Sequence, residues 1–252
     1  MNIPYWLAHF ENNRLCRPEP DWSAPFTMPE GKRALLARSL AEYQLGDGGG
    51  ECRLVAHDAE RFRSSRAELD RLVDLWFAEE KEHSRLLAGA VNRVGGTFVA
   101  DTFAMRMFYA CRRGLGVQFE LLVLLIVEIV STGYYRMIRR HVGDEPIAAM
   151  CKLILRDEAR HIDFHRDRLA ARYPCGFGTI RALGFRLLGY ACASFLWLGH
   201  GRALSAIGGS RQELFHHVSS GTRGFLSEMA ARVENRRHQV SSGHRPVHAT
   251  ST

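Results

Sequence analysis

The chain has 252 residues, 46% of them hydrophobic and 24% charged, which is enough apolar material for one large domain or two small ones. Its net charge of +7 comes partly from arginines near the C-terminus (Arg232, Arg236, Arg237 and Arg245), so a basic tail on an ordinary domain explains the charge without an acidic partner. The six cysteines are scattered and form no CxxC motif, which argues against a disulfide framework and for reduced intracellular thiols.

No segment has the composition of a targeting signal or the length of a membrane span. The N-terminal stretch MNIPYWLAHFENNRLC lacks a basic region followed by an apolar one, so we expect no signal peptide. The longest uncharged apolar run, residues 187–199, has 13 residues, whereas a span needs roughly 18. We expect a buried helix there, with an interfacial helix as the alternative. The protein is therefore expected in the cytoplasm, without a transmembrane segment.

Prolines divide the first part of the chain. Five of the eight lie in residues 1–29, and we expect residues 1–30 to form an extended arm. None lies between Pro29 and Pro146, which favours a helical core over residues 31–172. The first core helix is expected to be bent or interrupted at GDGGG (residues 46–50). Ser65 and Glu68 form a capping box that starts the next helix.

The second half of the core follows a long connection over residues 97–116. A strongly apolar helix is predicted for residues 117–141, and Pro146 fits the first turn of the helix after it. That helix ends at YPCGFG. Two more helices, about 178–206 and 211–236, form a C-terminal extension (173–236) that packs on the bundle, and residues 237–252 are expected to be a disordered basic tail. No strand pattern competes, so the fold class is all-α.

Two stretches, FAEEKEH and LRDEARH, repeat an acid-Glu-x-x-His pattern. On a helix, residues i and i+3 share a face, so Glu80 projects with His83, and Glu158 with His161. Carboxylate oxygen and imidazole nitrogen together suit a first-row metal ion. A third Glu-x-x-His, Glu213 to His216, has no preceding acid, and a capping box from Ser210 explains its glutamate.

The acids that precede the two motif glutamates are Glu79 and Asp157. About 0.1 copies of the extended pattern are expected by chance, so two copies indicate a function. A metal-bound imidazole needs a partner for its second nitrogen, usually a carboxylate. Glu79 and Asp157 point about 100° away from the adjacent glutamates, toward a neighbouring helix. We expect each of them to orient the histidine of the opposite motif; solvated surface charges are the alternative.

Two further carboxylates are needed for a pair of ions. Glu128 interrupts the apolar run LLVLLIVEIV, where an uncompensated charge would be costly. It lies 15 residues before Gly143, as Glu158 lies 15 after it, so both stand about 22 Å from that turn. The last carboxylate is either Asp47 or Glu51, and helix geometry favours Glu51. Four carboxylates and two neutral histidines would balance two divalent ions.

The motifs EEKEH and DEARH, Glu128 between them and LGDGGGE ahead resemble the ferritin-like di-iron carboxylate superfamily, over about residues 33–170. The resemblance implies a ferritin-like four-helix bundle with a long crossover between its second and third helices. It places Asp47, not Glu51, at the first-helix ligand position, although the family has Glu there. It also implies two iron ions, or iron with manganese, as cofactor, and an orienting role for Asp157.

Many members of this superfamily activate O₂, so the resemblance implies an oxidase or oxygenase acting on a small molecule, with an electron-donor protein and, as one option, a homodimer. No catalytic residue beyond the metal ligands is predicted. An iron-storage or peroxide-scavenging protein without an organic substrate is the alternative, and a helical bundle that has lost its metal is a third. His165 is expected in a supporting or surface role rather than as a seventh ligand, and Tyr43 in core packing rather than redox chemistry.

Overall fold

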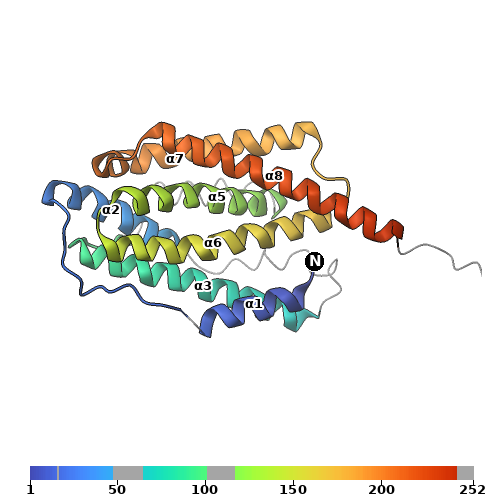
Figure 1. Ribbon diagram of the computed structural model, residues 1–252, viewed down its shortest axis with the longest axis horizontal. Coiled ribbons are helices and arrows are strands. Elements are labelled where there is room, and N and C mark those ends of the chain that lie inside the picture. The colour runs from blue at the N-terminus through green and yellow to red at the C-terminus, as the bar shows by residue number, and fades with distance from the viewer. Residues whose placement is uncertain (16, 48–64, 101–116, 243–252) are drawn as a thin grey trace, which may run out of the picture.

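The computed structural model describes residues 1–15, 17–47, 65–100 and 117–242 (Figure 1). Over these residues the fold is all-α, as predicted, with seven helices and no strand. The helices are α1 (Ile3–Leu15), α2 (Glu30–Asp47), α3 (Arg66–Arg93), α5 (Val117–His141), α6 (Glu145–Arg172), α7 (Thr179–Ile207) and α8 (Arg211–Ser242). The predicted break at GDGGG and most of the long connection lie outside the described residues.

The N-terminal segment differs from the extended arm that its prolines predicted, because residues 3–15 form helix α1. Pro4 lies in the first turn, where its missing N–H costs no intrahelical hydrogen bond. Trp6 and Phe10, one turn apart, are buried and pack against Trp76 of α3 and Phe164 of α6. In a helix, Trp6 and Phe10 lie on the same face, so both can be buried against α3 and α6.

The ends of the two motif-bearing helices have clear local causes. Ser65 caps α3 as predicted: its hydroxyl accepts from the Glu68 N–H, and the Glu68 carboxylate accepts from the Ser65 N–H. Asp144 caps α6 by accepting from the backbone N–H of Ile147, with Pro146 in the first turn. Gly143, between α5 and α6, has a φ of +69°, which glycine adopts without strain. Because these caps fix where α3 and α6 begin, they fix the position of each motif along its helix axis.

Helices that follow each other in the chain pack against each other in pairs. In the packed body, α2 lies against α3, α5 against α6, and α3 also meets α6. Helices α7 and α8 form a further layer over α5, with α8 also touching α6, while α1 lies on the opposite side against α3 (Figure 1). The predicted C-terminal helices are therefore present, but α8 continues to Ser242, so residues 237–242 are helical rather than part of a disordered tail.

Among the residues that the structure describes, two helical stretches are long and apolar enough to cross a membrane by length and composition alone, Gln118–His141 and Thr179–Ile207. In the first, 72% of the apolar window is buried, as in the core helix of a folded domain; in the second the buried share is 22%. The sequence criterion of an uncharged run missed both, because each contains glutamate or arginine.

Candidate metal centre

Five of the predicted ligands converge between three helices. Helix α3 supplies Glu80 and His83, α5 supplies Glu128, and α6 supplies Glu158 and His161. The two histidine side chains are fully buried. The i, i+3 spacing on α3 and α6 turns each Glu-His pair inward together, so the two repeated stretches face each other.

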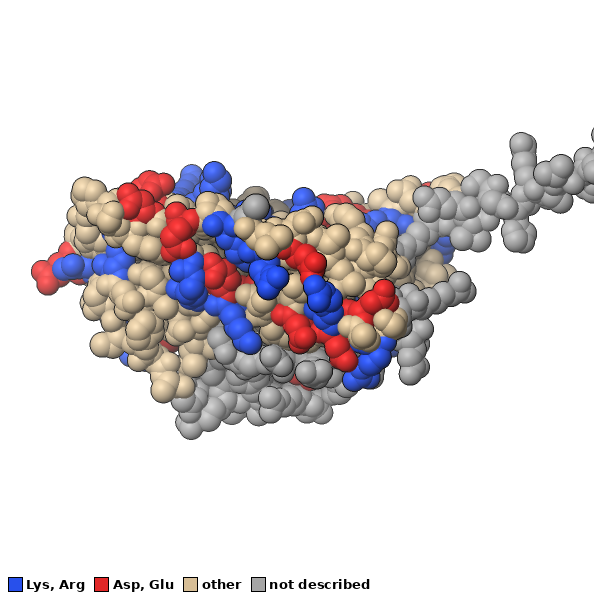
Figure 2. Space-filling model, turned by 90° about the horizontal axis from the view of Figure 1, so that it is seen from below, with Lys and Arg blue, Asp and Glu red and all other residues tan. Residues whose placement is uncertain are grey.

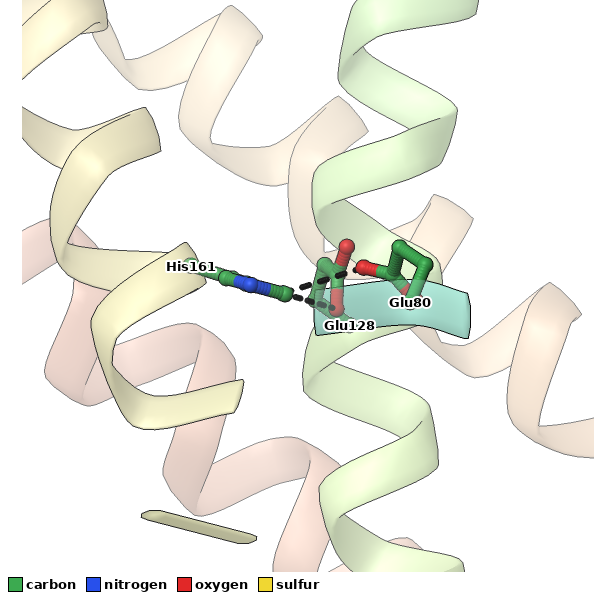
Figure 3. A group of neighbouring side chains, drawn as sticks. All are labelled: Glu80, Glu128 and His161. Atoms are coloured by element: carbon green, nitrogen blue, oxygen red, sulfur yellow. Dashed lines mark ion pairs between the residues drawn. The ribbon is translucent and has the colours of Figure 1, made fainter. Parts of the chain in front are cut away.

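One half of the cluster is centred on the Nδ1 atom of His161. This nitrogen lies 3.1 Å from Oε1 of Glu80, 3.7 Å from Oε2 of Glu128 and 3.9 Å from Oε2 of Glu158. Figure 3 shows the imidazole of α6 pointing at Glu80 and Glu128, which approach it from α3 and α5. One ligand atom from each of these three residues lies within 4.8 Å of the other two, a spacing that one metal ion could occupy.

The other half is centred on the Nδ1 atom of His83. It lies 3.6 Å from Oε1 of Glu158 and 3.7 Å from Oε2 of Glu80. Glu80 and Glu158 thus each present one oxygen to one imidazole and the second oxygen to the other. Carboxylates in this position can bridge two cations.

The outward-facing nitrogens of the two imidazoles pair across the helices. Nε2 of His83 lies 3.2 Å from Oδ2 of Asp157, and Nε2 of His161 lies 3.0 Å from Oε2 of Glu79. Each orienting acid therefore contacts the histidine of the opposite motif, the arrangement expected from the sequence. With Nε2–H donating to a carboxylate, each Nδ1 keeps its lone pair for the interior, where a metal ion could accept it.

Several inward-facing polar atoms make no hydrogen bond to any described residue, although they are buried. They include Oε1 of Glu80, Oε2 of Glu158 and Nδ1 of His161. Leaving such atoms without a partner costs roughly 1–3 kcal/mol each, more if they are charged. Three of them meeting at one point fit a bound cation, because a cation would satisfy all three at once.

Helix α1 holds the outer carboxylates in place, which the sequence did not indicate. The side-chain amide of Asn13 donates to both Glu79 and Asp157, the latter at 2.9 Å. Arg17 forms an ion pair with Asp157, and Arg156 donates to Asp157 and to the Asn13 carbonyl. Asn13 is 66 and 144 residues from its two partners, so no local spacing could have revealed it.

The pKa values of the clustered side chains are shifted in different directions. Burial opposes ionisation of Glu80, but the imidazoles of His161 and His83 beside it outweigh this effect and hold its pKa below the usual value. Burial and the neighbouring charges of Glu128 and Glu80 raise the pKa of Glu158 well above the usual value. Burial lowers the pKa of His161, but its three glutamate partners outweigh this and raise it well above the usual value. The raised pKa values of Glu158 and His161 both favour proton binding within this carboxylate-rich cluster when no metal is bound.

An aromatic wall encloses the His161 side of the cluster. The ring of Trp76 stacks on His161 with centroids 3.9 Å apart, and Phe10 of α1 lies 6.1 Å from the same ring. These rings keep water from the imidazole, and low polarity strengthens the surrounding electrostatic contacts. On the outer side of Glu79, α1 and α3 leave a cavity of about 270 Å³ that is lined by three arginines and three glutamates.

The remaining predicted residues have different outcomes. Asp47 is the last residue of α2 but its side chain lies outside the described part of the chain, as does Glu51 altogether, so the choice between them stays a prediction. His216 is exposed, and the Ser210 hydroxyl accepts from the Glu213 N–H at 3.1 Å, which is one half of the predicted capping box; the Glu213 carboxylate pairs with Nε2 of His141 at 2.8 Å.

His165 and Tyr43 occupy supporting positions. His165 is buried rather than at the surface, accepting at Nδ1 from Arg168 at 3.1 Å. Burial, with the charges of Arg168 and His161, lowers its pKa well below the usual value. Tyr43 stacks on Tyr134 with ring centroids 3.7 Å apart, as expected for core packing.

Comparison with known proteins gives no further guidance. No protein-family model, no curated protein and no solved structure matches the chain. The case for a function therefore rests on the side chains themselves.

Proposed function

We propose that this protein is a di-metal carboxylate oxidoreductase with a ferritin-like bundle, binding two iron ions or one iron and one manganese. The observation that carries the proposal is the reciprocal pairing of the two motifs. Each histidine donates outward to the acid of the other motif and presents Nδ1 inward to shared glutamates. Burying the four acids and two imidazoles of these motifs together is no efficient way to stabilise a purely structural helix pair, because the desolvation cost of the charged groups can exceed their mutual attraction.

In this proposal the four bundle helices are α2, α3, α5 and α6, and the connection between α3 and α5 is the long crossover. The contacts of α2 with α3, α5 with α6, and α3 with α6 support it. Ferritin-like di-metal proteins take one glutamate from each of two helices and a Glu-x-x-His pair from each of the other two. Here α3 and α6 carry the pairs, α5 carries Glu128, and α2 would supply Asp47 or the segment after it Glu51.

The residues that would hold the ions are Glu80, His83, Glu128, Glu158 and His161, completed by the first-helix acid. Their donor set, oxygen with two imidazole nitrogens, suits iron or manganese better than a thiolate-preferring metal. When bound, two such ions supply redox chemistry with O₂. The chain itself orients the imidazoles through Glu79 and Asp157, and excludes water on one side through Trp76 and Phe10.

The activity proposed is O₂-dependent oxidation or hydroxylation of a small molecule in the cytoplasm, with electrons from a donor protein. The buried aromatic wall supports an oxidase over a storage protein, because a storage site needs access for ions more than shelter from water.

The test is metal analysis followed by reaction with O₂. Protein purified without chelator, or loaded anaerobically with Fe(II), Mn(II) or both, should bind two ions per chain; O₂ should then change the optical spectrum of the iron-loaded protein. His161→Ala should lose metal, whereas His216→Ala, in the third Glu-x-x-His, should load normally. Equal loading of the two variants would refute the site. Loading of two ions with O₂ uptake but assembly into a many-subunit cage would favour storage instead.

A further inference from the structure

Helix α7 presents an apolar stripe to solvent. Five large apolar side chains on it are exposed by more than half: Ile180 (87%), Leu183 (54%), Leu187 (58%), Phe195 (52%) and Leu198 (85%). Their spacing of three, four and eight residues puts them on one side of the helix. Isolated exposed leucines are ordinary, but a contiguous row of this length marks an interaction surface.

The opposite side of α7 is fixed to the rest of the protein. Gly189 lets the helix approach α8 so closely that an added Cβ would meet the Thr222 methyl at 3.0 Å. Phe185 stacks on Phe225 of α8 with centroids 5.3 Å apart. Because this face is anchored, α7 cannot turn its exposed row inward, and the row remains available to a partner in the folded protein.

Small residues interrupt the row in a symmetrical order. Gly184, Ala191 and Gly199 are all exposed, and nothing lies within 4 Å of a Cβ added at either glycine. Counted from Ala191, leucine stands at −8, glycine at −7 and leucine at −4, while phenylalanine stands at +4, leucine at +7 and glycine at +8. If a second α7 helix lies antiparallel to the first with the two Ala191 residues level, each leucine near an end of the row therefore stands level with a glycine of the other helix.

We propose that α7 pairs with α7 of a second copy of this chain, antiparallel about a two-fold axis at Ala191. In that register Leu183 stands level with Gly199 of the second copy, and Gly184 stands level with Leu198 of the second copy. Leu187 meets Phe195 of the second copy, and the two Ala191 side chains meet at the axis. A two-fold interface uses the same patch on both subunits, so a row that is complementary to its own reverse is what it requires.

A lipid surface is the main competing occupant, and the small residues argue against it. Membrane adsorption strengthens with buried apolar area, to which Gly184, Ala191 and Gly199 add little. Helix packing instead uses small residues, because they let two backbones approach. The row from Leu183 to Gly199 is about 24 Å long. One helix face of that length lies at the small end of specific interfaces, so we expect a dimer that dissociates at roughly micromolar concentration.

Sedimentation of the full chain over a concentration series tests the pairing. The wild type should shift from monomer to dimer, and Ala191→Glu, which places two carboxylates at the axis, should weaken association at least tenfold. Ala67→Glu is the matched control on an exposed position of α3, far from α7, and should dimerise like the wild type. Circular dichroism checks that both variants fold. A wild type that stays monomeric at 100 µM (about a hundredfold above the expected range) would overturn the proposal, as would an undiminished dimer of Ala191→Glu.

Crosslinking tests the register. Ala191→Cys should link to itself across the axis under mild oxidation, above the background given by the native cysteines. Gly184→Cys lies on the same row but seven residues from the axis, so its two copies would be about 21 Å apart and should not link. Efficient linking of Gly184→Cys but not Ala191→Cys would overturn the register. Binding of monomeric wild type to anionic phospholipid vesicles, abolished by Ala191→Glu, would assign the row to a membrane instead.

Discussion

Replacing Glu158 by glutamine should separate metal binding from folding, because burial and the neighbouring carboxylates raise the pKa of this carboxyl well above its usual value in the folded apoprotein. Glutamine keeps the size and neutrality of the protonated acid. The pKa of Glu158 is raised in the folded state, so the stability linked to its proton is complete below its usual pKa of 4.5 and is lost as pH rises toward the folded value. The wild type carries this loss at neutral pH, and glutamine does not.

The size of the effect follows from that linkage. Above about pH 4.5, the free energy of unfolding of the apo wild type should fall relative to that of apo Glu158→Gln. The difference should grow by up to roughly 1.4 kcal/mol per pH unit until the pH reaches the folded-state pKa of Glu158. Bound metal should reverse this order of stability, so that the wild type becomes the more stable protein. At a free metal concentration of 100 times Kd, one site stabilises the folded state by about 2.7 kcal/mol, or roughly 5–11 °C in Tm for a chain of this size. The variant should lose most of this shift.

Thermal unfolding with chelator and with anaerobic Fe(II) or Mn(II) at pH 7 measures both effects. Without metal, Glu158→Gln should unfold at or above the wild-type Tm; with metal it should unfold below it. Glu213→Gln, in the third Glu-x-x-His, should keep the full metal shift. A metal shift equal to the wild type in Glu158→Gln would remove Glu158 from the ligand set, and an apoprotein weakened by more than about 2 kcal/mol would show that its carboxylate is ionised and bonded.

Three further outcomes are expected. Asp157→Asn should weaken metal binding by about 10–100-fold in a competitive chelator titration, and Asn13→Ala should weaken it less, because it acts through the orienting acids rather than on an imidazole directly; no change in either would refute the orienting roles. The lowered pKa of His165 gives stability that is present above pH 6.5 and lost as pH falls, so His165→Gln should flatten the apoprotein stability profile below pH 6.5 by up to about 1.4 kcal/mol per unit, whereas an unchanged slope would contradict burial of a neutral ring. Gly189→Ala should destabilise by about 1–3 kcal/mol in urea unfolding through overpacking, whereas Gly184→Ala should be neutral or gain up to about 1 kcal/mol; equal effects would contradict the close helix approach.

The parts of the fold that depend on neighbouring residues were predictable. The Ser65 capping box, Pro146 in a first turn and the inward side of each Glu-x-x-His are all set within four residues of chain. The cross-pairing of Asp157 with His83 could also be anticipated, because two identical motifs on facing helices leave each acid beside the other histidine. Periodicity and spacing carry such information without knowledge of the full fold.

Features that depend on how segments without a repeated motif pack together could not be predicted. Proline density suggested an extended N-terminal arm, but a single proline in a first turn leaves the following residues free to form a helix, and the burial of Trp6 and Phe10 favours one. Asn13 gives no local signal, since its contacts are created by the packing of α1. The exposed row on α7 was interpreted as buried, because hydrophobicity alone does not say which side of a helix is covered.

The position of α1 introduces an asymmetry into the proposed metal centre. The two motifs form a nearly symmetrical pair, and each orienting acid could be served by solvent. Instead one amide, from Asn13, bridges both acids, and Arg17 and Arg156 converge on Asp157 alone. The pKa of Asp157 is correspondingly low: burial opposes its ionisation, but hydrogen bonds from His83 and Asn13 and the charge of Arg17 outweigh it. The orienting acid of the His83 half thus has two arginine contacts in addition to Asn13, so the two proposed metal positions should differ in affinity even though their ligands are nearly alike.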